Sequence, residues 1–204
     1  MPRPFAVLAL ALALSVLVSG CAPLVVGAAA VGGTAVALDR RHTDVQLADE
    51  RIEITASRRI GPLIGSNGHV NIASFNKQVL LTGETTTEAL RAEVEKIAAA
   101  VPDVKGVANE IQIGPLASLA ARSRDTFLTS SIKARFVGDQ KFNPLHVKVV
   151  TEASVVYLMG LVTRKEAEEA THIARHVSGV RRVVRIFEYI PDPPPKTPSA
   201  EAPK

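Results

Sequence analysis

The chain has 204 residues, of which 47% are hydrophobic and 22% charged, with a formal net charge of +4 and a single cysteine. One cysteine excludes an internal disulfide framework. About 160 residues follow the apolar N-terminal region, a length that suits one ordinary domain or two small ones.

The first 20 residues are typical of an export signal. Arg3 supplies a positive charge, and Phe5–Val18 is apolar almost throughout before small residues appear. The sequence Val-Ser-Gly-Cys that ends at Cys21 fits a lipobox, in which the thiol accepts a diacylglyceryl thioether. We therefore expect residues 1–20 to be removed, Cys21 to carry diacylglycerol and an N-acyl chain, and residues 21–43 to form a lipidated linker segment.

An uncleaved transmembrane anchor is the alternative, because apolar residues resume after Cys21 and continue to Leu38. A spanning helix needs about 20 apolar residues. The run from Phe5 to Leu38 is longer and is interrupted by glycine and proline, which favours two short segments. Two acyl chains attach a protein stably where one is marginal. Ala22 is not the aspartate associated with inner-membrane retention, so the analogy favours an outer-membrane, periplasm-facing location.

Residues 44–114 predict a unit of the order α-β-β-α-β. The apolar spacing indicates a helix around 47–59, strands over 70–75 and 78–82, a helix over 86–100 and a strand over 107–113. Thr85 and Glu88 match the Thr-x-x-Glu capping box at the start of the second helix. The glycine-rich stretch Gly61–Gly68 lacks the lysine of a phosphate-binding loop and is interpreted as a loop.

Residues 124–190 repeat this pattern. Val79–Gly83 reappears as Val156–Gly160, and the expected elements are a helix over 125–137, strands over 147–151 and 155–159, a helix over 163–177 and a strand over 183–190. Thr163 and Glu166 again form a capping-box pattern. The interpretation is an α+β protein with two tandem α-β-β-α-β sandwich domains, joined by a linker over 115–123 and followed by a disordered proline-rich tail over 191–204.

This unit resembles the BON domain, through the apolar strand that ends in glycine, the helix rich in glutamate and alanine, and the closing Gly-Val-x-x-Val strand. Two copies after a lipobox resemble the dual-BON outer-membrane lipoproteins of the DolP type, which are associated with cell division and outer-membrane stress. The likeness covers Cys21 to about Ile190. It is strongest over Tyr157–Thr163 and Val177–Val180, and looser in the first copy, where Pro102–Val107 displaces the Gly-Val motif. The resemblance implies binding of anionic phospholipid through the second domain, support of outer-membrane integrity, and contact with the outer-membrane protein assembly machinery.

Charge is divided unequally between the two copies. Residues 45–114 carry seven basic and nine acidic side chains, for a net charge of −2, whereas residues 122–190 carry twelve basic and seven acidic, for a net charge of +5. The second copy is therefore suited to an anionic surface, where each basic group contributes ~1 kcal/mol.

The helix that opens the second copy has an apolar position with no obvious core role. At about 100° per residue, Leu128, Ile132 and Phe136 share the core face, which leaves Phe127 elsewhere. The predicted lipid-binding face comprises Phe127, Ser130, Ser131, Lys133, Ala134, Arg135 and Val137. An aromatic ring bordered by cations suits the headgroup region of a membrane. The alternative is that Phe127 packs under the linker or against the first copy.

The histidine and arginine residues of the chain form no pattern that predicts an active site. Among five histidines, only His172 and His176 have a suggestive spacing, but neither a following glutamate nor a third ligand is evident, so we expect an exposed helix face and no metal site. Arg181, Arg182 and Arg185 could meet nucleic acid, but export favours lipid or another envelope anion. We expect no catalysis, no nucleic-acid partner, and no cofactor beyond the acyl chains on Cys21.

Two functions from different classes remain open. The first is a lipid-binding module that supports the outer membrane. The second is a tethered adaptor whose first copy or proline-rich tail docks onto an envelope assembly or cell-wall protein.

Overall fold

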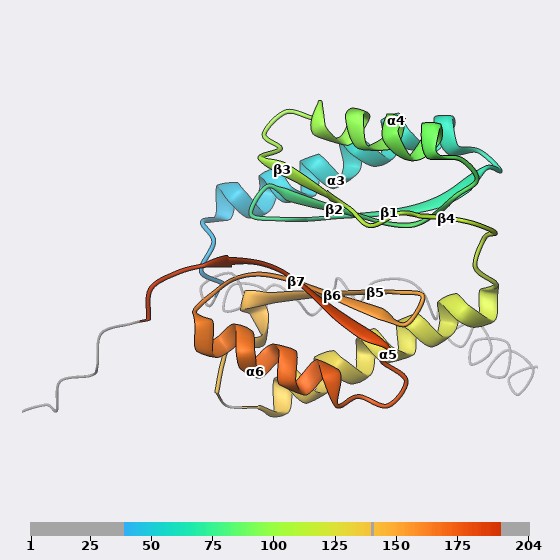
Figure 1. Cartoon of the computed structure of the whole chain (residues 1–204). Coiled ribbons are helices and arrows are strands. Elements are labelled where there is room, and N and C mark those ends of the chain that lie inside the picture. Colours follow the sequence, from blue (N-terminus) through green and yellow to red (C-terminus); the bar gives the residue numbers. More distant parts are fainter. Residues whose placement is uncertain (1–38, 140, 193–204) are drawn as a thin grey trace, which may run out of the picture. The chain divides into compact units, whose positions relative to one another are not determined.

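The computed structural model describes residues 39–139 and 141–192 (Figure 1). These residues belong to one compact body, Leu38–Lys204. The predicted export signal, Cys21 and residues 193–204 of the predicted tail lie outside the described residues. A fragment that begins at Leu38 therefore keeps every contact discussed below.

Two units of the predicted order α-β-β-α-β follow one another along the chain. The first contains α3 (Thr43–Ile64), β1 (Gly68–Phe75), β2 (Gln78–Thr85), α4 (Glu88–Ala99), β3 (Gly106–Asn109) and β4 (Gln112–Ile113). The second contains α5 (Leu119–Gly138), the short 3-10 helix η1 (Pro144–His146), β5 (Val147–Glu152), β6 (Val155–Val162), α6 (Arg164–Arg175) and β7 (Arg182–Tyr189). The predicted α+β class and the tandem repeat are confirmed.

Each unit builds its sheet around the second strand of its hairpin. In the first, β1 is antiparallel to β2, while β3 and β4 both run parallel to β2. In the second, β5 is antiparallel to β6, which pairs in parallel with β7. The strands β1 and β5 therefore lie at one edge of their sheets, and the helices α3 and α5 contact these same strands.

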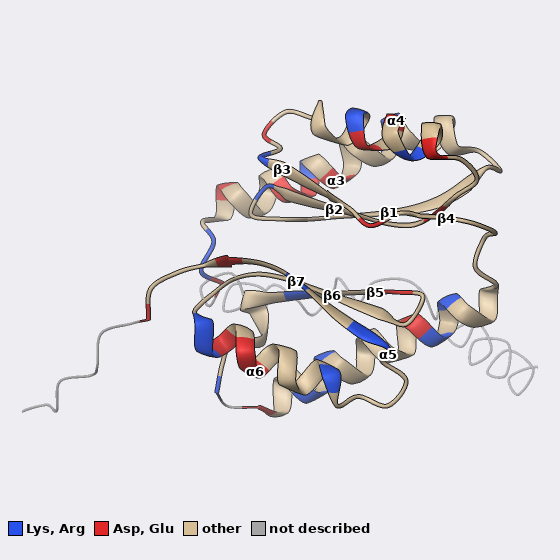
Figure 2. Cartoon of the chain, viewed as in Figure 1, with Lys and Arg blue, Asp and Glu red and all other residues tan. Residues whose placement is uncertain are grey.

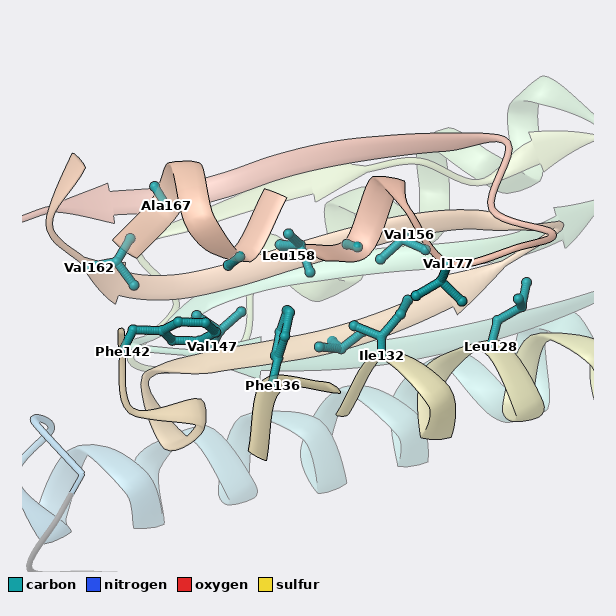
Figure 3. Close-up of a cluster of buried hydrophobic side chains, with 13 residues drawn as sticks. Leu128, Ile132, Phe136, Phe142, Val147, Val156, Leu158, Val162, Ala167 and Val177 are labelled. Carbon is teal, nitrogen blue, oxygen red and sulfur yellow. The ribbon is translucent and has the colours of Figure 1, made fainter. Parts of the chain in front are cut away.

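The central strand β6 is buried on both faces, and its side chains alternate between two cores. Val156, Leu158 and Val162 point into the core of the second unit, which α5 and α6 cover. This core is drawn in Figure 3 and comprises Leu128, Ile132, Phe136, Phe142, Val147, Val149, Val156, Leu158, Val162, Ala167, Ala170, Ala174 and Val177. Leu128, Ile132 and Phe136 thus occupy the core face predicted for them.

The opposite face of β6 packs against the sheet of the first unit. Val155, Tyr157 and Met159 form one apolar cluster with Ala73, Phe75 and Leu80. Two hydrogen bonds also join the units: the side-chain amide of Asn71 donates to Glu152, and the side-chain amide of Asn76 donates to Glu188. The face of each sheet that its own helices do not cover is therefore buried by the other unit.

Helix α3 continues beyond its predicted end at Arg59, so the interpretation of Gly61–Gly68 as a loop is wrong over its first half. Gly61 and Pro62 lie within the last turn of the helix, which ends at Ile64. Proline and glycine are unfavourable in a helix interior, but Ile60 and Ile64 continue the buried stripe of this helix. Burial of these two isoleucines extends the helix through a sequence that local propensity would end.

Three other boundaries also differ from the prediction. The cap of α4 is Thr87, whose side chain accepts from the Leu90 amide, so the predicted capping box at Thr85 is wrong. Thr85 is instead a fully buried residue of β2. The last strand of the first unit divides into β3 and β4, and α5 begins at Leu119, within the predicted linker. The capping box of Thr163 and Glu166 is confirmed.

Candidate functional site

A buried aspartate in the first helix of each unit holds the neighbouring hairpin. Asp125 of α5 accepts the backbone amides of Ala153 and Ser154 at 2.9 and 2.8 Å. Both turn residues have positive φ values, 49° and 61°, a region that L-residues rarely adopt. The carboxylate satisfies two amides that the hairpin leaves unpaired, and it fixes α5 against the sheet.

Asp49 of α3 makes the same contact in the first unit. Its carboxylate accepts the backbone amides of Asn76 and Lys77 at 2.8 and 2.7 Å, together with the hydroxyl of Ser74 at 2.7 Å. Neither aspartate was predicted from the sequence. A signal was present, because apolar core residues follow each of them at the same helical spacing: Asp49, Ile52, Ala56 and Ile60 in one helix, Asp125, Leu128, Ile132 and Phe136 in the other.

The predicted lipid-contact residues form an exposed surface on α5. Phe127 is 69% exposed and Val137 is 72% exposed, so the alternative in which Phe127 packs against the linker or the first unit is wrong. The structure also exposes Ser130, Lys133, Ala134 and Arg135, whereas Ser131 is half-buried. We call the exposed residues of this set, with Ser131 at the border, the α5 face.

Exposed apolar residues continue along α5 beyond the predicted α5 face. Leu119 is 82% exposed, and it precedes Val137 by five helical turns, so both side chains lie along one line of the helix. Leu116, just before the helix, is also exposed. The same spacing would have identified Leu119 from the sequence, had the predicted helix begun six residues earlier.

The two cations of the α5 face have different surroundings. Lys133 makes no polar contact with another described side chain. Arg135 donates to the backbone carbonyl of His176 at 3.3 Å, which ties the end of α5 to the end of α6. Figure 2 marks the positions of the basic and acidic residues along the ribbon of both units. Lys133 is therefore the cation of this surface most available to an external anion.

A family model of the BON domain matches residues 48–115 and 124–191, which correspond to the two structural units. The chain belongs to the BON-domain family. It is 33% identical over 189 residues to the outer membrane lipoprotein DolP of Haemophilus influenzae, an alignment covering 92% of this chain and 97% of the relative. It is also 27% identical over 155 residues to a 21 kDa hemolysin of Actinobacillus pleuropneumoniae, covering 75% of this chain and 80% of the relative.

A third relative, the osmotically-inducible protein Y of Escherichia coli, is 32% identical over 117 residues, covering 56% of this chain and 58% of that protein. Together with the two matched domains, the similarity over nearly the whole chain supports a DolP-type dual-BON protein associated with the outer membrane. Across residues 39–139 and 141–192, no helix is long and apolar enough to cross a membrane.

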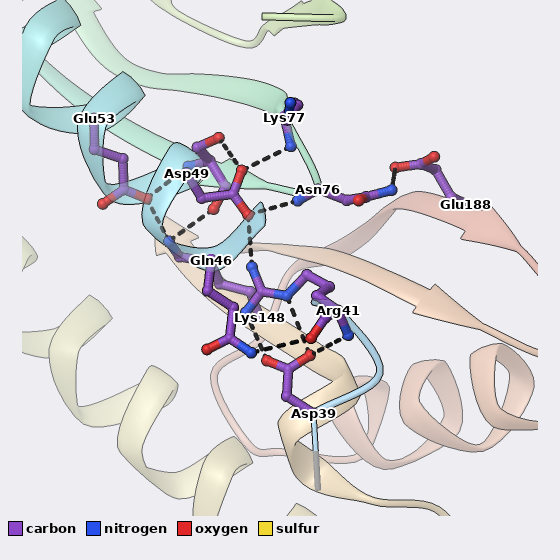
Figure 4. A network of polar contacts seen from close by, with 10 residues as sticks. Asp39, Arg41, Gln46, Asp49, Glu53, Asn76, Lys77, Lys148 and Glu188 are labelled. Atoms are coloured by element: carbon purple, nitrogen blue, oxygen red, sulfur yellow. Dashed lines mark hydrogen bonds and ion pairs between the residues drawn. The ribbon is translucent and has the colours of Figure 1, made fainter. Parts of the chain in front are cut away.

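The segment that precedes the first BON domain contacts both domains, and Figure 4 shows its contact with the first. Arg41 donates to Asp49 at 2.6 Å and lies over the ring of Phe75, with its guanidinium carbon 3.9 Å from the ring centre. Arg40 makes two hydrogen bonds, at 2.7 and 2.6 Å, to Glu166 of the capping box in the second BON domain. We call residues 39–41 the arginine strap. It was not predicted, because only the folded chain brings these residues together.

Three groups at the junction of the BON domains have shifted pKa values. Burial raises the pKa of Glu152, and the nearby charges of Glu84 and Asp125 add to this effect. Burial also raises the pKa of Tyr157, to about 12. The pKa of Glu166 is lowered, because hydrogen bonds from Arg40 and Thr163 outweigh the raising effect of burial. The strap therefore holds a carboxylate in its charged form.

His172 and His176 are exposed, as predicted, with ring centres 4.3 Å apart. Within the part of the chain that the structure describes, no three His, Cys, Asp or Glu side chains are arranged to hold a metal ion.

Proposed function

We propose that the protein is a lipoprotein anchored in the outer membrane through Cys21, and that it binds anionic phospholipid reversibly through the α5 face of its second BON domain. This contact would support outer-membrane integrity, including at division sites. The observation that carries the proposal is the exposure of Phe127 and Val137 on one side of α5, beside Lys133, which has no polar partner among the residues that the structure describes.

The energetics favour a reversible contact that the tether would strengthen. Burying one large apolar side chain contributes roughly 1.5–3 kcal/mol, and each cation near an anionic surface adds ~1 kcal/mol. Phe127, Val137, Lys133 and Arg135 therefore give a reversible interaction. Acyl chains on Cys21 would keep the domain close to the membrane, which raises its effective concentration there.

Vesicle flotation of the fragment Leu38–Lys204 tests the α5 face. We expect the fragment to float with vesicles that contain phosphatidylglycerol, but not with vesicles of phosphatidylcholine alone. The variant Phe127→Glu/Lys133→Glu should lose flotation. A matched control, Leu63→Glu/Lys96→Glu, changes an exposed leucine and an exposed lysine of the first BON domain and should float normally. Equal flotation of wild type and the α5 variant would exclude this face.

Metabolic labelling tests the anchor. Palmitate should label the wild-type chain, and globomycin should cause an unprocessed precursor to accumulate. The Cys21→Ser variant should take up no label, and a labelled variant would contradict attachment at Cys21.

A second function, docking onto the outer-membrane protein assembly machinery, is favoured by the surface of α3. Leu47 and Ile54 are both exposed and lie two turns apart on the mildly acidic first BON domain. We expect crosslinking to an assembly protein in intact cells to fall in Leu47→Glu/Ile54→Glu and to persist in Phe127→Glu. Loss of the crosslink only in Phe127→Glu would show that lipid binding brings the partner close.

A further inference from the structure

A cavity of about 500 Å³ opens beside the α5 face. Its walls come from α3, the end of β1, α5, η1 and the start of β5, and the arginine strap lines it as well. The lining residues are Asp39, Arg41, Gln46, Asp49, Glu50, Glu53, Ser74, Phe75, Lys133, Phe136, Val137, Pro144, Leu145, Val147 and Lys148. Its volume falls within the range of about 300–1,000 Å³ that is common for small-molecule sites.

The apolar lining of this cavity comes from both BON domains. Phe75 of the first domain and Phe136 and Val147 of the second are buried. Leu145 and Val137 are partly or largely exposed and continue the apolar wall toward solvent. An apolar ligand in the cavity could therefore contact apolar side chains at its buried wall and at its exposed edge.

Most of the charged lining groups are already neutralised by one another. Arg41 pairs with both Asp39 and Asp49, and Lys148 pairs with Glu53. Glu50 is exposed on the α3 wall, whereas Lys133 stands on the α5 wall without a polar partner among the described residues. An anionic group is therefore best placed on the α5 side of the cavity.

We propose that this cavity takes up one acyl chain of a phospholipid from the membrane that α5 contacts, with the lipid phosphate beside Lys133. The inference rests on the proposed function, because Lys133 and Val137 belong both to the cavity lining and to the α5 face. A lipid bound at the α5 face would have its chain next to an apolar opening. The two BON domains would then bind a single lipid molecule between them, while the α5 face of the second domain binds a charged surface.

Monomeric lipid probes separate chain capture from surface binding. The fragment Leu38–Lys204 is titrated with the fluorescent fatty acid cis-parinaric acid, whose emission rises in an apolar site. Dihexanoylphosphatidylglycerol, kept below its micelle concentration, then competes for the site. We expect saturable binding of the fatty acid and its displacement by the phospholipid.

Two exposed leucines provide a matched pair of variants. Leu145 and Leu63 are both 40% exposed, but only Leu145 lines the cavity. A carboxylate at Leu145 would have to be desolvated next to the chain, so Leu145→Glu should weaken probe binding at least about tenfold. Leu63→Glu should bind as wild type does. Thermal unfolding of both variants shows whether either one has lost its fold.

The outcomes also distinguish this inference from the proposed function. Phe127 lies outside the cavity lining, so Phe127→Glu should lose vesicle flotation and keep probe binding. Leu145→Glu should keep flotation through Phe127 while losing the probe. Absence of saturable binding in wild type, or unchanged binding in a folded Leu145→Glu variant, overturns the cavity proposal. Binding of the fatty acid without displacement by the phospholipid overturns phospholipid as the occupant.

Discussion

Replacing Asp125 by asparagine tests whether one carboxylate fixes the helix that carries the α5 face. The side chain is 5% exposed, and its two oxygens each accept one backbone amide of the β5–β6 turn. Asparagine keeps the shape but replaces one acceptor by a donor, so one of the two amides loses its partner. A hydrogen bond to a charged group contributes about 1.5–3 kcal/mol, and leaving a buried donor unsatisfied costs about 1–3 kcal/mol. We expect Asp125→Asn to lower the free energy of unfolding by about 3 kcal/mol.

Urea denaturation of the fragment Leu38–Lys204 measures this change, and melting should shift by roughly 6–12 °C for a chain of this length. Asp139→Asn is the matched control, because Asp139 accepts the Lys141 amide at the exposed end of the same helix. Its effect should stay below about 1 kcal/mol. Adding Ser154→Gly to Asp125→Asn should recover about 1 kcal/mol, since glycine adopts positive φ without strain. A loss below about 1 kcal/mol in Asp125→Asn, or an equal loss in the control, would show that the Asp125 carboxylate does not hold the hairpin turn.

Two further predictions concern carboxylates whose pKa values the fold shifts. Burial raises the pKa of Glu152, so its contribution to stability is present at low pH and is lost as pH rises through the folded pKa. Glu152→Gln should therefore raise the melting temperature at about pH 7 and have little effect near pH 4, and an equal gain at both would contradict this. The pKa of Glu166 is lowered, so its pairing with Arg40 stabilises the fold above the unfolded pKa and is lost as pH falls through the folded pKa. Arg40→Ala should lower the free energy of unfolding by about 1 kcal/mol near pH 7, and this difference should shrink near pH 3 in urea titrations. A loss that is independent of pH would show that Arg40 acts through packing alone.

The order of elements was predictable because hydrophobic spacing reports which face of each element is buried. Leu128, Ile132 and Phe136 occupy the core that their spacing indicated, and the exposed position of Phe127 followed from the same geometry. The residues at which helices and strands begin and end were less predictable. Thr85, Thr86 and Thr87 are consecutive, and the local sequence gives no means of choosing among them, because pairing of Thr85 with Gly68 and Ile113 extends β2 and delays the helix.

Contacts between distant residues could not be predicted from single motifs. Arg40 lies 126 positions from Glu166, and no local pattern connects an arginine before one domain to a capping box in the other. The cavity likewise depends on how the two sheets pack, which places Phe75 and Phe136 in one lining. Aligning α3 with α5 by their core residues would have revealed Asp49 and Asp125, the aspartates that hold the hairpins. It would not have revealed the strap.

The same alignment shows that the first copy lacks the aromatic and valine residues of the α5 face. When Asp49 is matched with Asp125, Phe127 corresponds to Arg51 and Val137 corresponds to Gly61. Arg51 is exposed as Phe127 is, so the scaffold places this position in solvent in both domains. An aromatic ring there is not needed to build the core, because the first domain folds around the equivalent core with an arginine in its place. The exposed ring of the second domain and the basic charge of that domain therefore support the proposed contact with anionic lipid.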